Sequence, residues 1–532
     1  MKQILAIFTK DARRFWPEIL ATLAVLVALV LVYPHSWRGN HEVVSMSLYG
    51  FLSHGSLGFL AGCLAVVVPV AWWILIARLV HGERLVGNTQ FWLTRPYEWP
   101  KFLAAKLLFL AAFLYLPFFL AQCALLVAGG FNPLSYLPGL LYNLVLVTGI
   151  LVLPLTALSV VTAGFGRMTL VVLGAIVFIA AVALLNSLLP SDAGGGVAGP
   201  LGGNLSFAIL ACGCVAAILV QYAKRKTRVA WLLIAMVALS LSALGFVDPD
   251  QASMDRRYPA DNATPAEITY APSTLHQPIT NGTRDKSELE IALPMRISGV
   301  ANGSAVIPVA LKAAISGSDG PRWESPWQPV YNQHYLPGVW DSTMRFRIRN
   351  SVYERFKMNP VNLQLTFAID QARAFGVSRT ALSSSEFDVP GVGICAPQST
   401  WLAFPPEING INCRSALRRP RLNYITVQWS EAECSTVPHE SENVLGTSWI
   451  GSFESDPAEF GITSVWETPL IFSNAMASYR QGQPVRPRQL CPGSPVVFTE
   501  YRLAGHTQLT VSIPNFRLPD LALGDVYELR SR

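Results

Sequence analysis

Four cysteines in the polar C-terminal part have a spacing that points to a defined chemistry. They are Cys395, Cys413, Cys434 and Cys491, with no Cys-x-x-Cys pair and no adjacent histidine among them. This spacing favours two disulfides over a zinc site, and so an oxidising compartment. Of the three possible connectivities we favour pairing neighbours in sequence, Cys395 with Cys413 and Cys434 with Cys491. The other four cysteines lie in apolar runs, where a free cysteine behaves as a small hydrophobic residue.

Motifs of enzymes and of ATP-binding proteins are absent from the sequence. It contains no Gly-x-x-x-x-Gly-Lys-Ser/Thr loop, no Gly-x-Ser-x-Gly elbow and no His-Glu-x-x-His zinc motif. The nearest approach to an elbow is at residues 446–450, where Ile450 stands in place of the second glycine. Histidines of the polar part occur singly, at His276, His334, His439 and His506. We therefore expect no catalytic residue, no cofactor and no metal, and the chain is not expected to be an enzyme.

A basic stretch between two apolar segments, residues 78–106, is the main candidate for binding a partner. Basic residues in a loop between membrane spans favour the cytoplasmic side. Residues 87–89 offer a turn and a helix N-cap, residues 90–94 form a short apolar piece, and Arg95-Pro96 ends it. The charged residues of the stretch are Arg78, Glu83, Arg84, Arg95, Glu98, Lys101 and Lys106.

This stretch resembles the first cytoplasmic loop of ABC-type export permeases of the type-2 class. The resemblance extends over roughly residues 1–222 and implies a coupling helix that docks on a separate cytoplasmic ATP-binding subunit. The simpler alternative is a positively charged loop whose aromatic residues lie among lipid headgroups without a protein partner. The residues that carry the resemblance are Glu83, Gly87, Phe91, Trp92, Leu93, Arg95 and Pro96, with Lys106 opening the next span.

Composition and charge indicate a membrane protein with a polar part attached. Of the 532 residues, 51% are hydrophobic and only 14% are charged, which is too apolar for an ordinary soluble protein. Residues 1–247 hold 15 Lys and Arg against 6 Asp and Glu, whereas residues 248–532 hold 25 against 28. The excess positive charge thus lies in the apolar half. It suits loops that face anionic lipid and gives no reason to expect a nucleic-acid partner.

Residues 1–247 are predicted to form a helical transmembrane domain with about seven spans. A basic amphipathic helix at residues 2–16, with Ile4, Phe8, Ala12 and Phe15 on its apolar side, is suited to the inner leaflet. The alternation of basic and non-basic loops places the N-terminus in the cytoplasm and the C-terminus outside. The spans are predicted at residues 17–33, 57–77, 102–127, 136–163, 168–189, 205–222 and 229–247.

Prolines interrupt three of the predicted spans. Pro69, Pro117 and Pro154 each remove a backbone donor and kink a helix. Ordinary irregularity of helix contacts and a gating hinge are both compatible with them. No predicted span contains a buried acidic pair or a chain of ionisable residues, so a proton- or sodium-driven carrier has little support.

Residues 248–532 are predicted to form an extracytoplasmic β-rich domain. Short runs of alternating apolar and polar residues, such as residues 289–293 and 363–369, are typical of half-buried strands in an antiparallel sheet. One or two β-sandwich domains fit the length. All four cysteines of this part follow residue 390, which indicates a second lobe that begins near there.

These features favour the membrane subunit of an ABC-type exporter in the inner or plasma membrane. Its expected partners are a cytoplasmic ATP-binding subunit, the lipid bilayer and a second permease copy. The seventh span exceeds the six of the family core and delivers the C-terminal domain to the outer side. The alternative is a membrane-anchored receptor or assembly factor whose outer domain binds a protein or glycan. An outer-face enzyme without a recognisable motif is a third option.

Overall fold

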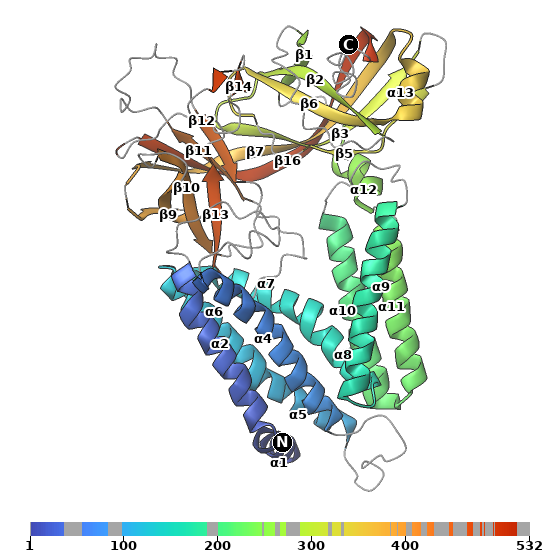
Figure 1. Cartoon of the computed structure of the whole chain (residues 1–532), viewed down its shortest axis with the longest axis vertical. Helices are drawn as coiled ribbons and strands as arrows, with labels where there is room; N and C mark the ends of the chain where they lie inside the picture. Colours follow the sequence, from blue (N-terminus) through green and yellow to red (C-terminus); the bar gives the residue numbers. More distant parts are fainter. Residues whose placement is uncertain are drawn as a thin grey trace.

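A computed structural model of the chain shows a helical bundle with a β-rich region at one end (Figure 1). Apolar helices fill the described residues as far as 246, and strands dominate from residue 267 onward. The predicted fold class, a helical membrane domain followed by a β-rich domain, is therefore confirmed. The structure describes residues 2–36, 56–82, 98–188, 200–246, 249–260, 266–272, 288–317, 322–330, 335–383, 385–390, 392–400, 407–416, 423–429, 446–450, 465–471, 479–480, 483–484, 493 and 495–518.

Six helical stretches among the described residues are long and apolar enough to cross a membrane, which makes the chain a multi-pass membrane protein. A further helix, α9 (Phe165–Leu188), lies where the fifth of seven spans is predicted and has a shorter apolar stretch, Phe165–Phe178, among its described residues. The six stretches are formed by α2 (Trp16–Ser36), α4 (Ser56–His81), α5 (Trp99–Leu110) with η2 (Ala111–Tyr115) and α6 (Leu116–Ala128), η3 (Pro133–Tyr136) with α7 (Leu137–Val147), η4 (Thr148–Val152) and α8 (Leu153–Val161), α10 (Pro200–Lys224) and α11 (Thr227–Phe246).

The helices alternate in direction, so that the N-terminus and the β-rich region lie at opposite ends of the bundle (Figure 1). The end away from the β-rich region is called the base of the bundle below. It holds α1 (Lys2–Arg14), the ends of α4, α8 and α10, and the starts of α5, α9 and α11.

Two of the long stretches contain a π-helical turn that ends two residues before a proline. Pro117 follows η2 and Pro154 follows η4. A proline has no backbone N–H and its ring clashes with the carbonyl four residues earlier, and a wider turn accommodates both effects. The hydroxyls of Tyr115 and Thr148 are 2.9 Å apart, so the two wide turns are joined side by side. Pro69 lies inside α4 without such a turn.

The β-rich region consists of antiparallel sheets in the described residues. A three-stranded sheet has the order β1 (Glu267–Tyr270), β2 (Glu288–Ser298), β6 (Trp340–Arg349). A seven-stranded sheet has the order β12 (Gly446–Ile450), β11 (Asn423–Trp429), β16 (Pro495–Phe516), β7 (Val361–Ala381), β3 (Ser304–Ser316), β4 (Arg322–Glu324), with β5 (Gln328–Pro329) also on β3. A four-stranded sheet has the order β13 (Val465–Ile471), β10 (Glu407–Ala416), β9 (Gly393–Thr400), β8 (Phe387–Val389), and β14 (Tyr479–Arg480) pairs with β15 (Gln483–Pro484). The short helices are α12 (Pro249–Arg257) and α13 (Asn350–Phe356).

The largest core of this region lies between the three-stranded and seven-stranded sheets. Alternate residues of β7, such as Leu363 and Leu365, are buried there together with Ile291 and Leu293 of β2. A smaller core surrounds Cys395 and Cys413. Strand β16 runs through both cores, because it contributes Val496 and Phe498 to the smaller core and Leu509 and Val511 to the larger.

Among the described residues, the β-rich region touches the bundle at two places. The hydroxyl of Tyr33, near the end of α2, donates to the backbone oxygen of Val465 at 3.3 Å, and Leu126 and Leu140 belong to the same buried cluster as Val465. At the second place α12 connects α11 to the seven-stranded sheet, where the Tyr258 hydroxyl donates to Asp370 Oδ1 at 2.9 Å. The sheets are thus joined both to the early helices and to the last one.

Candidate functional site

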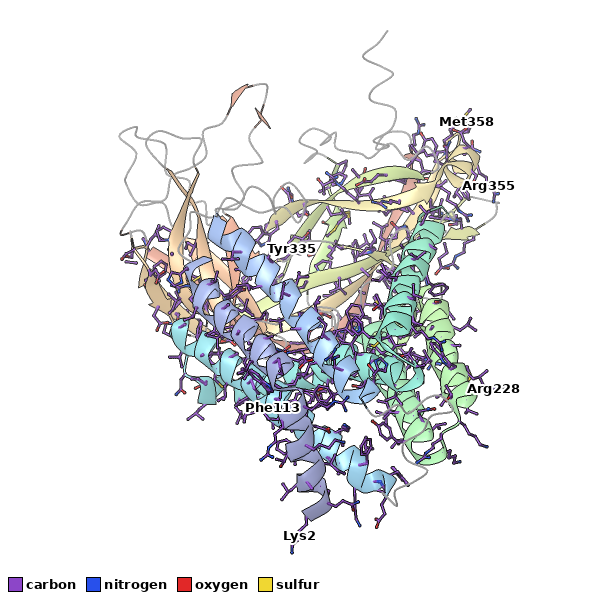
Figure 2. The ribbon with its side chains drawn as sticks, turned by 60° about the horizontal axis from the view of Figure 1, so that its bottom comes forward. Lys2, Phe113, Arg228, Tyr335, Arg355 and Met358 are labelled. Carbon is purple, nitrogen blue, oxygen red and sulfur yellow. A yellow bond between two sulfur atoms is a disulfide. The ribbon has the colours of Figure 1, made fainter. Side chains whose placement is uncertain are left out.

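The base of the bundle holds the two ends of the predicted coupling loop. Gly82, after α4, and Glu98, before α5, are described and flank residues 83–97. Figure 2 turns this base forward, with Lys2 at the free end of α1. The predicted coupling residues Glu83, Gly87, Phe91, Trp92, Leu93, Arg95 and Pro96 all lie outside the described residues.

Helix α1 lies across the base, seen end-on in Figure 1 while α2 rises beside it. Its buried residues are Ile7 and Asp11, and Phe15 directly after it is buried as well. The predicted apolar side, centred on Ile4, Phe8 and Ala12, is only half-buried, so the contact stripe is rotated toward Ile7 and Asp11. Phe8 stacks on Phe113 of η2 with 5.6 Å between ring centroids. The stripe packs against other helices of the bundle.

A buried ion pair ties α1 to α5. The Lys106 ammonium lies 2.7 Å from Asp11 Oδ2, and the two side chains are 5% and 1% exposed. Lys106 also donates to the backbone oxygen of Leu79 in α4 at 3.3 Å and lies 4.9 Å from the centroid of the Phe102 ring. Asp11 Oδ1 has no hydrogen-bond partner among the described residues. Three helices therefore meet at one charge pair, and loss of either partner leaves an uncompensated buried charge.

Contacts around Gly82 join the end of α4 to the joint between α1 and α2. Arg78 forms an ion pair with Glu18 at 2.9 Å, and Arg14 Nη1 donates to the backbone oxygen of Gly82 at 3.3 Å. A Cβ atom at Gly82 would approach the ring of Phe15 to 3.0 Å and the Arg78 carbonyl to 3.1 Å. This close approach explains why a glycine suits the position where the predicted loop begins.

The base also reaches the later helices. His81 at the end of α4 hydrogen-bonds the hydroxyl of Thr162, after α8, at 3.0 Å. The rings of Phe102 in α5 and Tyr222 in α10 are 5.9 Å apart. Ile7 of α1 belongs to the buried cluster that contains Phe102 and Tyr222. Movement of α1 or of the start of α5 would therefore also displace α8 and α10, because these helices are in contact at the base.

In the described part of the chain, polar side chains join the third and fourth spans, and one of these contacts is buried. Gln122 of α6 and Asn143 of α7 are both buried, and the Asn143 amide donates to Gln122 Oε1 at 3.2 Å. The Tyr115–Thr148 bond lies in the same interface. Both contacts are between neutral groups. The described residues also contain no group of three or more His, Cys, Asp and Glu side chains that could hold a metal ion.

Outside the bundle the structure brings together two of the cysteines singled out from the sequence. Cys395 and Cys413 form a disulfide between directly opposed positions of β9 and β10, as predicted. Cys434 and Cys491 lie outside the described residues. His506, which stands alone in the sequence, is paired across the sheet with Asp370, and its Nδ1 lies 2.7 Å from Asp370 Oδ1.

No protein-family model matches the chain, and no curated protein is significantly similar to it. The geometry of the base is therefore the main ground on which a function can be argued.

Proposed function

We propose that this chain is the membrane-spanning subunit of an ABC-type exporter in the inner or plasma membrane. A separate cytoplasmic subunit binds and hydrolyses the ATP. The observation that carries the proposal is the buried Asp11–Lys106 pair, which holds α1, α4 and α5 together beside residues 83–97. A force that the ATP-binding subunit exerts on this loop would move the three helices together. A coupling helix must transmit force to the bundle in this way.

The charge of the base supports its assignment to the cytoplasmic side. Helix α1 contributes Lys2, Lys10, Arg13 and Arg14, and residues 224–228, where α10 ends and α11 begins, add four more basic residues. Such clusters are retained on the cytoplasmic side during membrane insertion. In this orientation the N-terminus is cytoplasmic and the β-rich region extracytoplasmic, where an oxidising compartment suits the Cys395–Cys413 disulfide.

The bundle offers a route from the base to the opposite end. The π turns at η2 and η4 are positions where two neighbouring spans can bend, because their hydrogen-bond ladder is already irregular. Above them, Leu126 and Leu140 reach the buried cluster that includes Val465 of β13. A tilt of these spans would thus be transmitted to the β-rich region.

Copurification tests the proposal. The full chain, tagged and extracted in mild detergent from the cells that naturally make it, should bring down a protein with a P-loop, and the complex should hydrolyse ATP. A chain that copurifies with no ATP-binding protein, from membranes in which it is folded and abundant, would contradict the proposal.

A receptor or assembly factor is the second candidate, and one observation favours it. Phe375 and Val377 on β7 are 59% and 56% exposed, although both lie in a regular strand of the β-rich region. Arg502 of β16 lies over the Phe375 ring. Aromatic and arginine side chains are enriched at the energetically important positions of protein-binding surfaces. A receptor would lose its ligand on Phe375→Ala, whereas an exporter complex would keep its ATPase.

A further inference from the structure

A cavity of about 420 Å³ lies at the base of the bundle, on the side of the later helices. Thr162, which lines it, is hydrogen-bonded to His81 at the end of α4, so the cavity lies at the same end of the bundle as Gly82. In Figure 2, Arg228 marks the start of α11, well away from Lys2 and α1. The lining residues are Val161, Thr162, Ala163, Arg167, Leu170, Val171, Thr227 and Trp231.

The surroundings of the cavity are strongly basic. Arg167 lines the wall, and Thr227 belongs to the sequence Lys224-Arg225-Lys226-Thr227-Arg228. Across residues 151–246 the only acidic residue is Asp192, which lies between α9 and α10, outside the described residues. Among the described residues, Arg167 has no ion-pair partner. The cavity is therefore lined by a cation that no carboxylate of the described residues neutralises.

The rest of the lining suits a lipid better than a small free anion. Val161, Leu170 and Val171 form an apolar wall, and Leu170 is 70% exposed on the surface of α9. Trp231 adds an aromatic ring of the kind that lies at the level of lipid headgroups. An anion held at Arg167 thus has an apolar path beside it along which an acyl chain can lie.

We propose that this cavity binds the headgroup of an anionic phospholipid. Arg167 pairs with the headgroup phosphate, the ring of Trp231 lies at headgroup level, and one acyl chain follows Leu170 along α9. Basic cavities between transmembrane helices on the cytoplasmic side recognise anionic headgroups by the same combination of charge and depth. The inference requires that the helices span a bilayer and is independent of the proposed ATP-binding partner.

Lipid titration of the purified full chain tests the inference. After delipidation in detergent, phosphatidylglycerol, phosphatidylcholine or inorganic phosphate is added, and bound lipid is counted by native mass spectrometry. Phosphatidylglycerol is expected to bind in one saturable event, while phosphatidylcholine and phosphate compete poorly. Arg167→Gln should weaken phosphatidylglycerol binding about tenfold or more, because a charge-assisted hydrogen bond is lost.

Two further variants separate a defined site from a general effect of charge. Leu170→Trp leaves every basic residue in place but fills the apolar part of the cavity, and it should also weaken binding about tenfold or more. Arg13→Gln removes another exposed charge from the base, outside the cavity, and should leave binding within about twofold. Equal losses in Arg167→Gln and Arg13→Gln would overturn the inference. So would equal binding of phosphatidylcholine, or full competition by inorganic phosphate.

Discussion

Removing one partner of the Asp11–Lys106 pair should destabilise the bundle strongly. The two side chains are 1% and 5% exposed, and their 2.7 Å contact joins α1 to α5. Asp11→Leu leaves the Lys106 ammonium buried without its counter-charge, and Lys106→Met leaves the Asp11 carboxylate in the same condition. Loss of one partner of a buried pair costs about 3–5 kcal/mol, most of it from the charge left behind. Each single variant is expected in that range.

The double variant separates this mechanism from simple loss of contact. With Asp11→Leu and Lys106→Met together, no charge remains buried, and two apolar side chains of similar length fill the space. Replacing a buried pair in this way is often neutral or stabilising. We therefore expect the double variant to lie within about 1 kcal/mol of the wild type, so the two single losses should be grossly non-additive.

The assay is reversible unfolding of the purified chain in mixed micelles, followed by circular dichroism as the denaturing detergent increases. The Glu18–Arg78 pair provides a matched control at the same end of the bundle. Its arginine side chain is 58% exposed, so Glu18→Gln should cost no more than about 1 kcal/mol. If Asp11→Leu costs no more than Glu18→Gln, or if the double variant loses the sum of the single losses, the proposed role of the pair is refuted.

Two further predictions concern topology and the disulfide. A cysteine introduced at Thr227, at the base, should be shielded from an impermeant thiol reagent in intact cells. A cysteine introduced at Met358, which is 80% exposed in the β-rich region, should be labelled. The reverse labelling pattern would contradict the proposed orientation. Replacing Cys395 and Cys413 by alanine should lower the free energy of unfolding of the β-rich region by about 3 kcal/mol in the chain-entropy model, because the bond closes a loop with a sequence separation of 18. A change below about 0.5 kcal/mol in chemical denaturation would refute that estimate.

Periodicity and length allowed the fold class to be predicted. Apolar runs near 20 residues predict membrane helices because every backbone polar group must be satisfied within the segment. Alternation at residues 363–369 predicts β7, since Leu363, Leu365 and Phe367 on one face of that strand lie in the larger core. The order of strands could not be predicted in this way. That β16 lies between β11 and β7 depends on strand pairing between residues far apart in the sequence, such as Trp429 with Val496 and Ala381 with Pro495.

The candidate site was predictable only in part. Lys106 was singled out through the family resemblance, but Asp11 was missed because an acid among lysines and arginines is typical of an exposed helix face. One signal was present: Asp11 is four residues from both Ile7 and Phe15, so it continues a buried stripe. His506 was missed for a similar reason, because Asp370 becomes its neighbour only through strand pairing.

The most direct measurement of the proposed function is ATP turnover by the purified complex of this chain with its ATP-binding partner. The Glu83→Ala, Trp92→Ala double variant tests the predicted coupling helix, and Trp99→Ala is the matched control, since Trp99 is a 43% exposed tryptophan at the start of α5 just beyond the loop. Aromatic anchors at interfaces often cost about 2 kcal/mol or more when cut to alanine. The loop variant should insert and fold yet lose the partner and the stimulated turnover, and the control should keep both. Wild-type copurification and turnover in the loop variant would contradict the proposal.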